Sequence, residues 1–280
     1  KSIIYDVFCH QVILGFIFNI IFIIKKPKII FYSDNAEMTD VIYRASERNI
    51  ITVDIQHSIL SDLNILYQQP YAIDKKYLSD YILTYSKYWH DFLSIKCSKV
   101  EVGNYVRDYY QKKFKNKTKP YNNITIISSI VSRAKLVKLA KKLSIKFPNN
   151  KIVYKLRPEE YSNWKINYPE SLSSLSNVEF ICNEKKELYE HLYNSQYVIG
   201  TNSTALIQAI PFANVIVIKS GWYNELKPLI NDGFVKFAKN DNEVLEIIFE
   251  GCKKKKKAEN ILYKKDFESN IKKFTSSLNI

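Results

Sequence analysis

Two polar segments in the second half of the sequence are suited to binding a phosphate group. In the first, Gly200 ends an apolar run and is followed by Thr201, Asn202, Ser203 and Thr204, ahead of a predicted helix. The free N–H groups and the dipole at a helix start favour an anion, and the hydroxyls of Ser203 and Thr204 can bind one directly. The alternative is that Asn202 or Ser203 only caps the helix.

The second segment, 155–160 (KLRPEE), lies at the end of a predicted strand that Pro158 stops. Lys155 and Arg157 alternate with apolar neighbours, so at least one of them is expected near the strand tip. A guanidinium group matches phosphate with two parallel hydrogen bonds. The alternative is a surface ion-pair cluster with Glu159 and Glu160.

A histidine in the first half is the leading candidate for a general base. His57 follows the predicted strand 50–56 (IITVDIQ). An imidazole accepts a proton readily because its pKa lies near neutrality, although a lone histidine is more often structural. Asp34 and Glu37 follow another predicted strand and are alternative bases, or they only favour the start of a helix.

A fourth segment, 102–108 (VGNYVRD), follows a short predicted strand. Gly103 indicates a tight turn there, and its role could be purely architectural. The sequence has no GxGxxG, P-loop, HExxH, GxSxG or DxD motif. Their absence argues against NAD-dependent redox chemistry, nucleotide hydrolysis, zinc proteolysis and serine hydrolysis.

Short apolar runs alternate with helical stretches, a pattern that predicts βαβ units and parallel sheets. Ligands of such sheets bind beyond the carboxyl ends of the strands, where all four segments fall. Strands are predicted at 28–33, 50–56, 81–85, 100–102, 124–130, 151–156, 178–182, 197–200 and 215–218. Helices are predicted at 12–24, 36–48, 133–147, 186–194, 204–209 and 243–278, besides those expected to begin near Ser86 and Val106.

The composition fits a globular protein: 280 residues, 46% of them hydrophobic. The four cysteines lie far apart, which argues against disulfides and zinc and for a reducing compartment. The net charge of +14 suggests nucleic acid, anionic lipid or a phosphorylated substrate, or only an AT-rich genome. The helix 12–24 is about 20 Å long, too short to span a bilayer, so we expect it to be buried; an interfacial anchor, favoured by Lys25, Lys26 and Lys28, is the alternative.

In their order, the polar segments resemble motifs of bacterial GT-B glycosyltransferases of surface-polysaccharide synthesis. The likeness is greatest to teichoic-acid-type CDP-glycerol polymerases and to transferases for sialic acid and Kdo. These enzymes show QHG at a strand end, a stretch like "yiltfgeyW", then VGNP, then K-L-H-P with acidic residues, then an S-T pair opening a helix. The counterparts, within about residues 28–235, are 56–58 (QHS), 81–89 (YILTYSKYW), 102–105 (VGNY), 155–160 (KLRPEE) and 202–204 (NST).

Three positions depart from that pattern. Ser58 replaces the glycine, Tyr105 replaces the proline, and Arg157 replaces the histidine of the HP pair. In the relatives, that histidine binds the donor phosphate or assists departure of the nucleotide. Arg157 can neutralise phosphate but cannot donate a proton near neutral pH, so we expect donor binding to persist while rate or donor choice changes.

The resemblance implies an α/β, GT-B-like fold of two Rossmann-like parallel-sheet domains facing a cleft. Residues 1–115 would form the acceptor-side domain, with its usual first strand missing, 116–250 the nucleotide-sugar domain, and 251–280 a basic C-terminal helix. His57 would be the base, with Asp34 and Glu37 as alternatives. The donor would be held by Lys155, Arg157, Glu160, Thr201, Asn202, Ser203 and Thr204, and the acceptor side or cleft would include Gln56, Ser58 and Asn104.

The implied function is an inverting transfer of a sugar or related group from a nucleotide-activated donor to a surface glycan such as capsule, lipo-oligosaccharide or O-antigen. No cofactor or metal is expected, because the nucleotide-sugar is a substrate. The expected partners are that donor, a glycan or lipid-linked acceptor and, through the lysine run 253–257, an anionic membrane surface, but no nucleic acid. The expected location is the cytoplasm, including the inner membrane face. The alternatives are a non-hydrolysing sugar-nucleotide epimerase and a non-catalytic basic protein that binds polyanions.

Overall fold

The computed structural model describes residues 3–34, 38–63, 67–68, 73–117, 122–183, 187–221, 223–251 and 258–278. The chain divides into two compact units. Unit 1 consists of Lys1–Asp108 and Asn260–Ile280, and unit 2 of Tyr109–Glu259. The C-terminal segment therefore packs with the first part of the chain, whereas the sequence set 251–280 apart as a separate helix.

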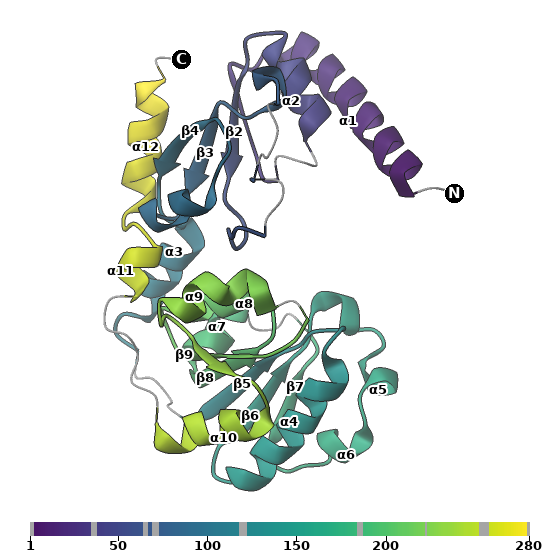
Figure 1. Cartoon of the computed structure of the whole chain (residues 1–280), viewed down its shortest axis with the longest axis vertical. Helices are drawn as coiled ribbons and strands as arrows, with labels where there is room; N and C mark the ends of the chain where they lie inside the picture. Colours follow the sequence, from purple (N-terminus) through teal and green to yellow (C-terminus); the bar gives the residue numbers. More distant parts are fainter. Residues whose placement is uncertain are drawn as a thin grey trace. The chain divides into compact units, whose positions relative to one another are not determined.

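Unit 1 contains a four-stranded parallel sheet in the order β1-β2-β3-β4. The strands are β1 (Ile29–Tyr32), β2 (Ile51–Ile55), β3 (Tyr81–Thr84) and β4 (Ser98–Glu101). Helices cover both faces, which is why β1, β2 and β3 are rich in isoleucine, valine and leucine, whereas the edge strand β4 (SKVE) is mostly polar. Helix α12 (Phe267–Ser277) packs on one face, where Phe274 contacts the core residues Val53, Leu83 and Val102. Helices α1 (Ile3–Lys25) and α2 (Thr39–Ser46) lie on the other face (Figure 1).

Helix α1 is not buried as the sequence predicted. Phe22 is buried and Leu14 and Phe18 pack against α2, but the opposite side of the helix is exposed. An all-apolar helix indicates burial but does not say what covers it, and here α2 covers one side only. The exposed apolar residues are Val12, Ile13, Phe16, Ile17, Ile20, Ile21, Ile23 and Ile24. Among the described residues, no helix combines the length and apolarity needed to cross a bilayer.

Unit 2 contains a six-stranded parallel sheet in the order β10-β9-β8-β5-β6-β7. The strands are β5 (Asn123–Ile127), β6 (Lys151–Lys155), β7 (Val178–Ile181), β8 (Ser195–Gly200), β9 (Asn214–Ile218) and β10 (Lys236–Ala238). The sequence predicted all of these except the three-residue β10. The chain adds β6 and β7 on one side of β5 and then returns to add β8, β9 and β10 on the other. The strand order therefore reverses between β5 and β8, and such a reversal marks where ligands bind in open α/β sheets.

Helices cover both faces of this sheet (Figure 1). Helices α4 (Arg133–Lys146) and α10 (Asp241–Glu250) bury Leu136, Leu143 and Val244 against Ile124 and Ile126 of β5. Helices α7 (Leu188–Tyr193), α8 (Thr204–Ala209) and α9 (Lys227–Asn231) lie on the opposite side. The remaining helices are α3 (Tyr105–Phe114), α5 (Trp164–Asn167), α6 (Glu170–Ser173) and α11 (Ala258–Leu262), with 3-10 turns η1 (Lys75–Tyr77), η2 (Lys87–Phe92), η3 (Pro158–Glu160) and η4 (Tyr223–Leu226).

The single helix predicted over 243–278 is wrong. The described part of this stretch forms α10, α11 and α12, and the lysine run 253–257 lies outside it. Two left-handed residues interrupt the path: Gly251, with a φ of 74°, follows α10, and Asp266, with a φ of 62°, precedes α12. The apolar spacing continues across Asp266 through Tyr263, Phe267 and Ile271 and gives no sign of that break, whereas the apolar pattern stops at Phe249, and Gly251 is a residue typical of a helix end.

Hydrogen bonds attach the C-terminal segment to the carboxyl side of β3. The Tyr85 carbonyl accepts from Lys264 N at 2.7 Å, and Trp89 Nε1 donates to the Leu262 carbonyl at 2.9 Å. Gly103 meets the same segment: its φ is 92°, and a Cβ there would lie 2.3 Å from the Lys264 carbonyl oxygen. Only glycine fits this turn, because both the backbone angle and the close approach exclude a side chain.

We predict that Gly103→Ala lowers the free energy of unfolding by about 2–4 kcal/mol, because it adds steric overlap to an unfavourable backbone angle. Chemical denaturation measures the change. The matched control is Gly221→Ala, where nothing lies within 4 Å of the added Cβ. Equal stability of the two variants would show that the turn at Gly103 does not need glycine.

Candidate functional site

A pocket of about 410 Å³ lies in unit 2 near the carboxyl ends of β5 and β6. It brings together Lys155, Arg157 and Ser203, three of the residues that the sequence nominated for phosphate binding. They come from the end of β6, the following loop and the loop after β8, so the strand reversal places them side by side. The lining residues are Ile127, Lys155, Leu156, Arg157, Pro158, Tyr161, Glu187, Leu188, Ser203 and Ala205.

Lys155 is the main charged group of this pocket. Its side chain is only 8% exposed, and its Nζ donates to the Leu156 carbonyl at 3.1 Å and to the Tyr161 hydroxyl at 2.5 Å. The ammonium also lies 4.9 Å from the centre of the Tyr161 ring. No carboxylate of the described residues forms an ion pair with it. A buried cation without a counter-ion is costly, so an anion entering the pocket would relieve an existing penalty.

Arg157 connects two of the loops that form the pocket. Its Nε donates to the Ser128 carbonyl at 3.3 Å, and its Nη2 donates to the Asn202 carbonyl at 3.4 Å. Both bonds are long, and neither uses Nη1. The guanidinium is thereby held in place while part of its donor edge stays available to a ligand.

The polar residues after β8 have different surroundings. Ser203 caps α8, since its Oγ accepts from Ala205 N at 3.3 Å, and it also lines the pocket. The buried Thr201 hydroxyl donates to Asn202 Oδ1 at 3.1 Å. Thr201, Asn202 and Thr204 do not line the pocket. Ser203 therefore caps the helix, as the alternative interpretation predicted, and its role in phosphate binding stays a prediction.

Glu160 lies beneath the pocket and does not line it. It is 2% exposed and accepts hydrogen bonds from Ser128 Oγ at 2.5 Å, Tyr168 Oη at 2.6 Å and Arg157 N at 3.2 Å, while Arg133 Nη2 lies at 3.5 Å. Burial alone would raise the pKa of Glu160, but these hydrogen bonds and the Arg133 charge outweigh it and lower the pKa. Glu160 therefore stays ionised and fixes the loop that carries Arg157.

In unit 1, two of the expected acceptor-side residues support the backbone. The buried Gln56 accepts from Tyr85 N at 2.8 Å through Oε1 and donates to the Ser58 carbonyl at 3.1 Å. Asn104 Oδ1 accepts from Arg107 N at 2.9 Å, within the first turn of α3. Ser58 is half-buried, and its Oγ lies 3.5 Å from the Ile59 carbonyl.

The candidate bases lie at the carboxyl ends of β1 and β2. His57 is exposed just beyond β2. Asp34 is half-buried just beyond β1, and its φ of 76° is unusual for a residue other than glycine. Glu37 lies outside the described residues. The assignment of the base to His57, Asp34 or Glu37 stays a prediction.

Sequence reasoning missed a fourth ionisable group, Asp54 in β2. It is 1% exposed, and its Oδ2 accepts from the Tyr67 hydroxyl at 2.9 Å. Burial raises the pKa of Asp54 to about 6, although the Tyr67 hydrogen bond and nearby His57 oppose the shift. The signal was a carboxylate inside the β-branched run IITVDIQ. Within the described part of the chain, no group of three or more His, Cys, Asp or Glu side chains is arranged to hold a metal ion.

Comparison with solved structures establishes the fold. The UDP-GlcNAc 2-epimerase of Neisseria meningitidis, bound to UDP-GlcNAc, matches with a TM-score of 0.66 and 15% identity over 96% of this chain and 80% of that one. A putative UDP-N-acetylglucosamine 2-epimerase of Listeria monocytogenes matches with a TM-score of 0.67 and 12% identity over 95% of this chain and 80% of that one. Anabaena HepE, in complex with UDP and glucose, matches with a TM-score of 0.52 and 12% identity over 90% of this chain and 78% of that one.

The chain therefore has the α/β GT-B-like fold with two parallel sheets, which nucleotide-sugar epimerases and glycosyltransferases share. No protein-family model and no curated protein sequence matches it significantly.

We predict that Asp54→Asn flattens the pH dependence of stability in the acid range. An Asp pKa is about 3.9 in an unfolded chain, so a folded pKa of about 6 gives stability that is complete below pH 4 and lost as the pH rises through 6. Asparagine stays neutral and still accepts from Tyr67. Above pH 6.5 the variant should therefore be more stable than the parent by about 1–3 kcal/mol. Urea denaturation at a series of pH values measures this.

Tyr67→Phe is the complementary variant. It removes a hydrogen bond that favours the carboxylate, so the loss of stability should extend to higher pH than in the parent. Parallel pH profiles for the parent and Asp54→Asn would contradict the assigned role of Asp54.

Proposed function

We propose that the chain is an enzyme acting on a nucleotide-activated sugar whose diphosphate binds in the pocket of unit 2. The buried Lys155 ammonium, which has no carboxylate partner among the described residues, carries this proposal, because it supplies a charge that an entering phosphate would neutralise. Arg157 and Ser203 add hydrogen-bond donors on the same side. A volume of about 410 Å³ lies in the usual range for small-molecule pockets.

The remaining lining orients this ligand. Glu187 also lines the pocket, and its carboxylate would repel phosphate but accept hydrogen bonds from sugar hydroxyls. We therefore place the phosphates beside Lys155 and Arg157 and a hydroxyl-bearing ribose or sugar ring beside Glu187. Leu188 and Ile127 offer apolar surface to the ring faces.

Among reactions on such a donor, we put epimerisation of its sugar first. Solved UDP-GlcNAc 2-epimerases from two bacteria match at least 95% of the chain with TM-scores of 0.66 and 0.67. An epimerase inverts one carbon of the sugar and needs no acceptor. In this reaction one of the candidate bases of unit 1, His57, Asp34 or Glu37, would move the proton.

Glycosyl transfer to a surface-glycan acceptor is the second candidate. The ordered motifs that resemble polysaccharide glycosyltransferases favour it, and HepE with UDP and glucose has the same fold. Here His57 would remove the proton of the acceptor hydroxyl, and Lys155 and Arg157 would stabilise the departing phosphate. A single displacement with inversion needs only one such base.

Incubation of the protein with UDP-, CDP-, CMP- and GDP-sugars in D₂O, without any acceptor, separates the two reactions. Epimerisation predicts a second nucleotide-sugar by NMR, whereas transfer predicts an unchanged donor until a glycan acceptor is added. Absence of both reactions and of any thermal shift with these nucleotides would overturn the proposal.

We predict that Arg157→Ala weakens nucleotide binding by about 10-fold or more, because one charge-assisted contact is worth about 1.5–3 kcal/mol. Isothermal titration with the best-binding nucleotide measures it. Lys138→Ala, which removes an exposed charge from α4 outside the pocket, is the matched control and should bind normally. Unchanged affinity in a folded Arg157→Ala variant would remove Arg157 from the site.

We predict that loss of the general base lowers kcat by about 10²–10⁴-fold with little change in nucleotide affinity. His57→Ala tests the leading candidate, and Asp34→Asn and Glu37→Gln test the alternatives by the same assay. A loss confined to one carboxylate variant would move the base to that residue. Full activity in all three variants would exclude these three groups as the base.

A further inference from the structure

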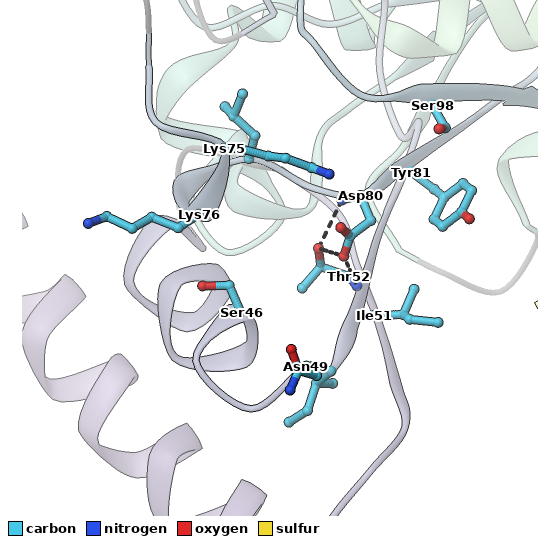
Figure 2. Close-up of a pocket in the computed structure, with 11 residues that line it drawn as sticks. Ser46, Asn49, Ile51, Thr52, Lys75, Lys76, Asp80, Tyr81 and Ser98 are labelled. Carbon is cyan, nitrogen blue, oxygen red and sulfur yellow. Dashed lines mark hydrogen bonds between the residues drawn. The ribbon is translucent and has the colours of Figure 1, made fainter.

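A second pocket, of about 480 Å³, lies in unit 1 at the end of the sheet opposite the candidate bases (Figure 2). It is lined by Ile51, Tyr81 and Ser98, which are the first residues of β2, β3 and β4. His57 and Asp34, in contrast, lie beyond the carboxyl ends of their strands. The pocket is therefore distinct from the site already described.

The floor of this pocket is rigid and polar. Asp80 Oδ2 accepts from both Thr52 N and Thr52 Oγ1 at 2.9 Å, and Asp80 N lies 3.0 Å from Thr52 Oγ1 and 3.1 Å from the Thr52 carbonyl (Figure 2). These bonds hold the carboxylate in one orientation. None of them uses Oδ1, so this oxygen can accept hydrogen bonds from a ligand.

Two consecutive lysines at the rim differ in their surroundings. Lys76 Nζ lies 3.4 Å from Asp74 Oδ2, and Figure 2 shows its side chain pointing away from Asp80. The Lys75 side chain instead extends toward Asp80 in Figure 2, and its ammonium has no ion-pair partner within the described ranges. Both lysines belong to the turn η1, which Asp74 caps by accepting from Lys76 N at 3.1 Å.

The pocket therefore combines donors, an acceptor and apolar surface. Lys75 donates, Asp80 accepts, and the Asn49 amide and the Ser98 hydroxyl can do both. Ile51 and Tyr81 add apolar surface beside them. The Lys75 side chain extends toward the Asp80 carboxylate in Figure 2, so a phosphate held by Lys75 would lie beside that carboxylate and be repelled by it. A sugar ring matches the whole set, because it presents hydroxyls at its edge and C–H groups on its faces.

We propose that this pocket binds a hydroxyl-rich, uncharged saccharide unit through Lys75 and Asp80. A pocket for hydroxyl groups follows from the lining alone. The choice of a sugar over another polyol rests on the second candidate of the proposed function, in which a glycan is the acceptor. The pocket would then hold a sugar away from the reacting groups, as an anchor for a saccharide chain.

Saturation-transfer NMR with glucose and N-acetylglucosamine, and a ³¹P NMR titration with inorganic phosphate, each carried out on the intact chain, test the proposal. We expect millimolar binding of at least one of the two sugars, a roughly 10-fold loss of its affinity in Lys75→Ala, and no loss in the matched control Lys76→Ala. Ser98→Phe, which fills the pocket from an exposed position, should abolish the same signal. The nucleotide thermal shift should be unchanged in all three variants.

No binding of either sugar by the parent, or equal binding by Lys75→Ala and Lys76→Ala, would overturn the proposal. Binding of phosphate alone that depends on Lys75 would also overturn it, by making this an anion pocket. Sugar binding without any nucleotide thermal shift would support this pocket and overturn the proposed function. A nucleotide thermal shift without sugar binding would support the proposed function and overturn this pocket.

Discussion

The strand order of unit 2 reverses between β5 and β8, and the chemistry available to the pocket depends on that reversal. Two loops that leave neighbouring parallel strands in opposite directions cannot fill the space between them. Here that space receives Lys155 from β6 and Ser203 from the loop after β8, while Arg157 bonds to carbonyls on both sides. Residues 48 positions apart in the sequence, Lys155 and Ser203, are thus brought together by topology alone.

Two buried carboxylates, Glu160 and Asp54, show that hydrogen-bond partners and nearby charges decide whether burial raises a carboxyl pKa. Glu160 receives hydrogen bonds from two hydroxyls and a backbone N–H, with an arginine nearby, so it keeps its charge and holds a loop. Asp54 is also buried, but the Tyr67 hydroxyl, the nearby His57 and the backbone of Asp34 lower its pKa by less than burial raises it, so the pKa rises to about 6. The first arrangement stabilises a structure, whereas the second creates a group that can change protonation near neutral pH.

The sequence predicted most strands and named three of the residues that line the unit 2 pocket, because both leave local signals. Runs of isoleucine and valine mark buried parallel strands, and Lys155, Arg157 and Ser203 stand at or just beyond strand ends. The sequence did not predict roles that depend on residues far away in the chain. The backbone-supporting role of Gln56 depends on its hydrogen bond with Tyr85 N, 29 residues away. Asp54 would be expected to face solvent, and its burial depends on Tyr67, which lies outside its strand. The break at Asp266 depends on a backbone angle, which the hydrophobic spacing does not report, whereas the end of the apolar pattern before Gly251 was a signal that the predicted single helix ignored.

Because unit 1 is assembled from Lys1–Asp108 and Asn260–Ile280, the polypeptide crosses between the units twice. This connectivity sets an order for folding during synthesis. Unit 2 is continuous in sequence and can fold as soon as it has left the ribosome. The face of the first sheet that includes Val53, Leu83 and Val102 stays open until α12 has emerged. Unit 1 is therefore completed only after unit 2 has been synthesised, and this apolar face of its sheet lacks the cover of α12 until then.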